Sequence, residues 1–112
     1  MASFLEKVYE NALILELQEI GLKIEQQKPI NVYYCGKLVG EYFADLIIED
    51  CVIVELKTNE AISEANANQL INYLKATKIE VGLLLHFGQK PDYKRKIFNN
   101  QRKDLIKNLL NP

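Results

Sequence analysis

The sequence predicts an α/β domain in which helices flank a mixed central β-sheet, in the order helix, three strands, helix, strand. Three observations carry this prediction. Apolar and polar residues alternate through 41–58, as in a half-buried hairpin. Residues 3–20 and 63–77 each carry an apolar stripe at helical spacing. A continuous apolar run, 81–86, follows the second stripe and is typical of a strand buried on both faces.

The chain has 112 residues, of which 48% are hydrophobic and 26% charged. This length and composition suit one globular domain spanning residues 1–112. The sequence shows no apolar run near the ~20 residues of a membrane span and no basic-then-apolar leader. We therefore expect no membrane partner and, by default, a cytoplasmic location.

The first helix is expected over residues 3–20, with Gly21 as its C-terminal stop. Glu6 has two interpretations. Ser3 and Glu6 fit a capping box at the helix start, which the local sequence favours for Glu6. Alternatively, Glu6 is a site residue, because Tyr9 and Glu10 share its helical face.

Residues 23–34 predict a first strand, in which Pro29 favours an edge position or a bend. A turn at 35–37 returns the chain into the strand that contains Asp45. Strict alternation places Phe43, Asp45 and Ile47 on one face, and Ala44, Leu46 and Ile48 on the other.

A turn centred on Asp50 would set Asp45 opposite Glu55, with Cβ atoms about 4.5–5.5 Å apart. Two adjacent carboxylates repel each other, and a divalent cation between them would remove the repulsion. Lys57 lies on the same face and could offset charge or reach a phosphate. The alternative is a solvated face on which Asp45 and Lys57 form an ordinary ion pair.

The second helix is expected over 63–77, with Ser63 as its cap. Gln69 and Tyr73 lie one turn apart, so both can point at one ligand, although both also suit a plain surface. The crossover predicts that strand 81–86 runs parallel to a hairpin strand. Residues 93–98 suit a short edge strand or a helix start, and 101–110 a helix.

The formal net charge is −1, but the charges are unevenly distributed. Residues 90–112 hold seven basic and two acidic residues, so the tail 94–112 is expected to be basic and loosely held. It could attract phosphate, or it could form a solvated cationic helix face.

Cys35 and Cys51 suit reduced thiols at strand ends better than a disulfide, and their spacing with His86 does not suit zinc. His86, at the end of an apolar run, is more often structural than catalytic in such a setting.

The ordered set Asp45, Glu55-Leu56-Lys57 and Gln69-x-x-x-Tyr73 resembles the PD-(D/E)XK phosphodiesterase superfamily, with its restriction endonuclease-like core. The chain is also similar to the bacterial GxxExxY family through residues 3–10 and the 83–88 run LLLHFG. Ser3 stands where that family's motif has glycine. The similarity covers residues 3–98.

This resemblance implies a metal-dependent nuclease that hydrolyses DNA or RNA, with DNA favoured. Asp45 and Glu55 would hold Mg²⁺ or Mn²⁺, with Glu6 joining through water, and Lys57 would orient the attacking water or neutralise charge. Gln69, Tyr73 and the basic residues Lys94, Arg95 and Lys96 would position the substrate. The alternative is an inactive nuclease fold that binds nucleic acid or assembles with protein. A homodimer suits either function, since it would enlarge a groove.

Overall fold

The computed structural model describes residues 4–58, 61–88 and 90–103. Its seven elements are α1 (Phe4–Glu19), β1 (Ile24–Tyr34), β2 (Lys37–Ile48), β3 (Val52–Lys57), α2 (Glu64–Ala76), β4 (Val81–His86) and β5 (Asp92–Ile97). The expected Ser3 cap and the tail beyond residue 103 lie outside the described residues, and residues 100–103 are helical.

The five strands form one mixed sheet in the order β1-β2-β3-β4-β5. Only β3 and β4 pair in parallel, and the other neighbours are antiparallel. The α/β class, the mixed sheet and the parallel crossover through α2 are therefore confirmed. The fifth strand lies beyond the predicted order. Residues 92–97 form the edge strand that the sequence had left undecided, because backbone pairing with β4 settles their conformation.

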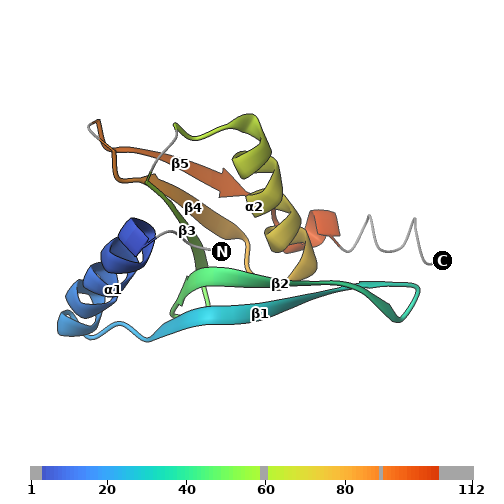
Figure 1. The fold of residues 1–112 in the computed structure, drawn as a ribbon. Coiled ribbons are helices and arrows are strands. Elements are labelled where there is room, and N and C mark those ends of the chain that lie inside the picture. The colour runs from blue at the N-terminus through green and yellow to red at the C-terminus, as the bar shows by residue number, and fades with distance from the viewer. Residues whose placement is uncertain (1–3, 59–60, 89, 104–112) are drawn as a thin grey trace.

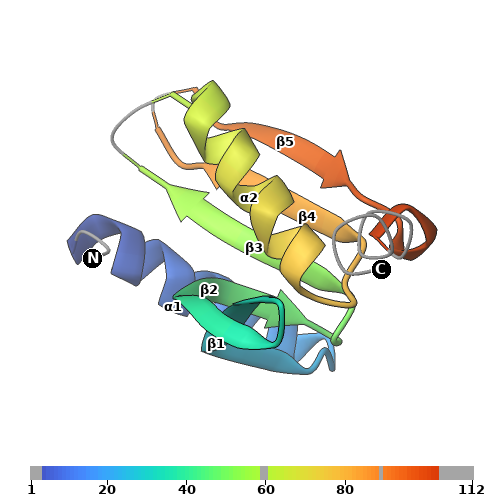
Figure 2. The ribbon, with the colours of Figure 1, turned by 90° about the vertical axis from the view of Figure 1, so that its right-hand side faces the viewer.

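The two helices cover opposite faces of the sheet (Figure 1), and α2 crosses over β3 and β4 (Figure 2). On the α1 face, Leu13 and Ile14 pack on a buried cluster of Leu46, Val54 and Leu56. On the α2 face, Leu70 and Leu74 pack with Ile47, Ile53 and Leu84, among others. A Cβ on Gly82 would lie 2.7 Å from Leu70 Cδ1, so a residue without a side chain lets α2 approach β4 closely.

Local signals explain where the elements end. Gly21, with φ of 86°, follows α1, and its N–H donates to the carbonyl of Gln18. The Ser63 side chain accepts from the N–H of Asn66 in a capping box at the start of α2. Cys35 and Cys51 lie in exposed turns at opposite ends of the 12-residue strand β2. That strand length, about 3.3 Å per residue, rules out a disulfide between them within one chain.

Strict alternation along β2 was wrong at one point. Ala44 packs in the α2-side cluster with Ile47, whereas Leu46 packs on the α1 side. The pattern breaks at Asp45, opposite Gln27, which has φ of 52° and no partner in the β1–β2 register. The positive φ of Gln27 thus coincides with the place where the side chains of β2 change face.

Candidate functional site

Asp45 and Glu55 meet where β2 and β3 separate. The last paired residues of these strands are Leu46 and Val54, and the turn that sets this register is centred on Asp50, as expected. One step further, the Asp45 N–H donates to Glu55 Oε1 at 3.2 Å, and the Leu56 N–H donates to Asp45 Oδ2 at 2.9 Å. Both carboxylates therefore lie side by side in the opening between the strands, one step beyond the last paired residues.

The environment of Glu55 opposes its ionisation. Burial raises the pKa of Glu55 to about 9, and the charge of Asp45 adds to this rise, while Lys57 acts in the opposite direction. Glu55 in the metal-free chain is therefore protonated at neutral pH. A cation placed between the two carboxylates would favour the charged form of both.

This pKa leads to a stability prediction. The folded chain keeps a proton on Glu55 that the unfolded chain releases above its ordinary pKa of 4.5, so stability falls as pH rises from there towards about 9. The slope is at most about 1.4 kcal/mol per pH unit. Urea unfolding in the presence of chelator, at about pH 6 and about pH 8, measures the free energy of unfolding at both pH values. The wild type should show this slope, and Glu55→Gln should not. At about pH 8 Glu55→Gln should therefore be more stable than the wild type.

The matched control is Glu41→Gln, which neutralises an exposed carboxylate on β2 outside the site. It should keep the wild-type slope. If Glu55→Gln were less stable than the wild type at about pH 8 without metal, the charge would be stabilising and our account of the pair would be incorrect.

Two residues that sequence reasoning did not select connect Asp45 to α1. Gln27 Nε2 donates to Asp45 Oδ1 at 3.3 Å and to Glu10 Oε1 at 2.9 Å. Glu10 is only 2% exposed and also accepts from Lys7 and Gln26. A positive φ at a residue other than glycine is costly, so the conformation of Gln27 is held by this network. No local sequence signal marks such a kink.

Lys57 is half-buried on the last residue of β3, on the face that carries Glu55. Its charge is near enough to lower the pKa of Glu55, against the effects of burial and Asp45. Asp45 bonds to the Leu56 amide and to Gln27. The arrangement therefore differs from the simple Asp45–Lys57 surface ion pair considered from the sequence.

Gln69 and Tyr73 of α2 face the same opening. The Gln69 side-chain amide donates to the Tyr73 hydroxyl at 2.9 Å. Burial raises the pKa of Tyr73 to about 12, and the charges of Glu55 and Asp45 raise it further, which places this hydroxyl in the field of the carboxylate pair. The Tyr73 ring also packs against Tyr42 of β2, with ring centroids 5.7 Å apart. The one-turn spacing thus brings both side chains to the site.

Glu6 lies beside the site without joining the pair. Its Oε1 accepts from Thr58 Oγ1 at 3.4 Å, just after the end of β3. Within residues 4–58, 61–88 and 90–103, no three His, Cys, Asp or Glu side chains form a metal-holding group. Asp45 and Glu55 therefore provide the shared pair, and participation of Glu6 stays a prediction. Nearby, the Tyr9 ring stacks on the Phe87 ring, with ring centroids 4.8 Å apart. This contact joins α1 to the end of β4.

The three basic residues on β5 divide between the faces of the sheet. Glu55 pairs across β3–β4 with Leu84, and Leu84 pairs with Lys94, so Lys94 shares the face of Glu55 two strands away. Lys96 lies on this face as well. Arg95 pairs with Leu83, whose side chain packs on the α1 side, so Arg95 points away from the site.

The donor set suits a hard divalent cation. Mg²⁺ binds through one or two carboxylates together with water and substrate phosphate oxygens, which is what Asp45 and Glu55 offer. An ammonium stands on the same face at Lys57, and a hydroxyl at Tyr73 lies across from the pair. Such a group can hold a cation, a water and a phosphate close together.

Comparison with known proteins identifies the family and the fold of the chain. A family model described as "PD-(D/E)XK nuclease superfamily" matches residues 2–97. The crystal structure of SSO0001 matches 92% of this chain with a TM-score of 0.63 and 18% identity, and the match covers 55% of that protein's length. At this identity the likeness shows a shared fold. The curated proteins contain no match. Within the described residues, no helix is both long and apolar enough to cross a membrane.

Proposed function

Because the chain belongs to the PD-(D/E)XK nuclease superfamily, we propose that it is a metal-dependent phosphodiesterase that hydrolyses nucleic acid, with DNA favoured over RNA. One observation carries the proposal: Asp45 and Glu55 lie side by side where β2 and β3 separate, with Lys57 on the same face. We also propose GxxExxY subfamily membership. The contact between Tyr9 of that motif and Phe87 of the LLLHFG run supports it.

The residues divide the work as follows. Asp45 and Glu55 would hold Mg²⁺ or Mn²⁺, which lowers the pKa of a coordinated water and offsets negative charge at the phosphate. Lys57 would orient the attacking water and stabilise charge that develops in the transition state. Gln27 holds Asp45 in place through its side-chain amide. Gln69 and Tyr73 would fix the substrate against the carboxylates, and Lys94 and Lys96 would contact phosphates further along the strand.

The test is a cleavage assay on single-stranded, duplex and branched DNA and on RNA, with Mg²⁺ or Mn²⁺. We expect cleavage of at least one substrate, lost when a chelator is added. Cleavage that persists in chelator would contradict the metal's role. No cleavage of any substrate in either metal would contradict the proposed activity.

A second candidate function is an inactive nuclease fold that binds nucleic acid or assembles with protein. It rests on the finding that, among the described residues, the Asp45 and Glu55 carboxylates have no third His, Cys, Asp or Glu side chain with which to form a metal-holding group. This function predicts gel-shift binding of nucleic acid, or a stable protein complex, without cleavage in any metal. Retention of Asp45, Glu55 and Lys57 together favours the enzyme.

A further inference from the structure

Glu10 is a charged residue on the side of α1 that faces the sheet, and only 2% of its side chain is exposed. Three side chains of the described residues donate to it. Oε2 accepts from Lys7 Nζ at 2.9 Å and from Gln26 Nε2 at 3.0 Å, and Oε1 accepts from Gln27 Nε2 at 2.9 Å. A buried carboxylate costs stability unless it is paired and hydrogen-bonded, and these contacts meet that requirement.

The two glutamines reach Glu10 from neighbouring positions on β1. Side chains of successive residues in a regular strand point to opposite faces, so one of the two would ordinarily turn away from α1. Gln27 departs from the regular strand, because it has φ of 52° and no partner in the β1–β2 register. Such a conformation costs free energy and persists where the surroundings hold it, often at functional sites. The costly conformation thus belongs to the residue that also donates to Asp45.

The two carboxylates that flank Gln27 determine which way its side-chain amide points. Its Nε2 lies 2.9 Å from Glu10 Oε1 and 3.3 Å from Asp45 Oδ1. A carboxylate only accepts hydrogen bonds, and an amide NH₂ group has one proton for each of the two. The opposite orientation would place the carbonyl oxygen of Gln27 against both carboxylates. The chemistry of its neighbours therefore fixes the orientation of Gln27.

We propose that Glu10 is a positioning residue of the candidate metal site, because by accepting from Gln27 it keeps the donor side of that amide on Asp45. Both oxygens of Asp45 are then held, Oδ1 by Gln27 and Oδ2 by the Leu56 N–H. Outer hydrogen bonds of this kind orient metal ligands, and their loss commonly lowers metal affinity about 10–100-fold. The effect on metal affinity rests on the proposed function, whereas the orientation of Gln27 does not.

Glu10→Gln tests this role, because the new side chain keeps the shape of glutamate but has one oxygen and one NH₂ group. Its oxygen can accept from both Lys7 and Gln26 only if its NH₂ group faces Gln27. Gln27 must then turn its carbonyl oxygen towards position 10, and that oxygen also meets Asp45 Oδ1. The variant therefore keeps the contacts that seat α1 on β1 but removes the donor from Asp45.

The first measurement needs no metal. In the ¹H–¹⁵N NMR spectrum of the metal-free wild type, both protons of the Gln27 side-chain amide should be shifted downfield and exchange slowly with water, since each bonds to a carboxylate. Glu10→Gln should lose this signature while its backbone amide signals stay dispersed, as in a folded chain. An ordinary, fast-exchanging Gln27 amide in the wild type would overturn the proposal, and so would an unchanged Gln27 signal in Glu10→Gln.

The second measurement is the affinity for Mn²⁺, by calorimetric titration, in a double-mutant cycle. Glu10→Gln and Gln27→Met should each weaken binding about tenfold or more, and the double variant should bind no more weakly than Gln27→Met alone. Wild-type affinity in Glu10→Gln, or additive losses in the double variant, would overturn the proposal. Glu16→Gln, which changes an exposed carboxylate of α1, is the matched control and should bind normally.

The two measurements separate this proposal from the proposed function. A wild type that binds no Mn²⁺ would count against the proposed function. The Gln27 signature, which needs neither metal nor cleavage, would then decide by itself whether Glu10 orients Gln27 towards Asp45.

Discussion

Asp45→Asn is expected to lose cleavage by about 10³-fold or more while the chain stays folded. The substitution removes one of the two charges that would hold the cation. Loss of the metal's charge stabilisation is worth several kcal/mol, and each 1.36 kcal/mol changes the rate about tenfold. Single-turnover cleavage at saturating Mn²⁺ measures the effect.

The fold should survive because asparagine still offers an oxygen to the Leu56 N–H, which bonds to Asp45 Oδ2 at 2.9 Å in the wild type. The substitution also removes the charge that helps raise the pKa of Glu55. Asp50→Asn is the matched control, since Asp50 lies in the exposed turn of the same hairpin and pairs with Lys23. The control should cleave normally. An Asp45→Asn protein that cleaved within tenfold of the wild type would remove Asp45 from the site.

Lys57→Ala is expected to lose cleavage by about 10²–10³-fold while keeping the cation. Removing one group that stabilises transition-state charge commonly has an effect of this size. Lys57 is not among the proposed ligands, so Mn²⁺ affinity should stay within a few-fold of the wild type. This separation of binding from rate distinguishes Lys57 from Asp45.

Lys57→Met tests whether charge or packing is responsible, because methionine keeps most of the aliphatic stem of this half-buried side chain. It should be as defective as Lys57→Ala. Lys37→Met, in the distant β1–β2 hairpin, serves as the matched control and should be fully active. Recovery of activity in Lys57→Met would show that Lys57 acts by packing.

The hairpin shows how far alternation can predict a site. A turn centred on Asp50 fixes the β2–β3 register, whose last pair is Leu46 and Val54. Asp45 and Glu55 are the next residues along the two strands, and hydrogen bonds from the Asp45 and Leu56 amides hold their carboxylates together. The one-turn helical spacing similarly brings the Gln69 side-chain amide within 2.9 Å of the Tyr73 hydroxyl. These relations are local, separated by at most one turn of helix or one tight hairpin, so their geometry follows from residue spacing.

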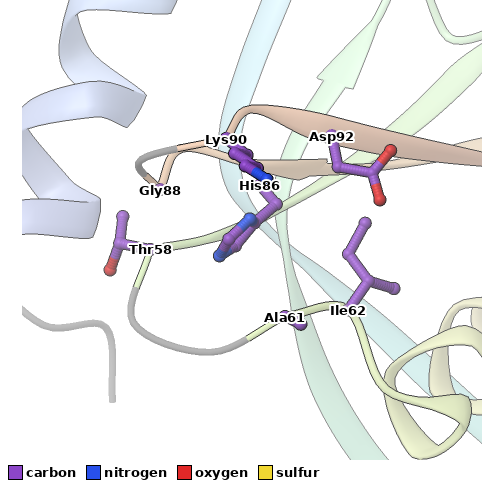
Figure 3. A pocket seen from close by; sticks show the side chains of 7 residues that line it. All are labelled: Thr58, Ala61, Ile62, His86, Gly88, Lys90 and Asp92. Carbon is purple, nitrogen blue, oxygen red and sulfur yellow. The ribbon is translucent and has the colours of Figure 1, made fainter.

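The parts that the sequence could not predict depend on contacts between distant segments. Gln27 reaches Asp45 and Glu10 through a kink with positive φ, which glutamine does not signal. Ala44, which packs on the α2 side against the expected alternation, lies beside this kink. The charged run in β5 suited a helix or a strand equally, and pairing with β4 decided between them. The pocket in Figure 3 is likewise lined from two separate segments, one that begins at Thr58 and one that begins at His86.

The central claim is that Asp45 and Glu55 form one divalent cation site, and a calorimetric titration of Mn²⁺ into the purified chain tests it most directly. The account predicts saturable binding of one Mn²⁺ by the wild type, lost in Asp45→Asn and Glu55→Gln and kept in Asp50→Asn. Absence of binding in the wild type, or equal binding in Asp45→Asn, would contradict it.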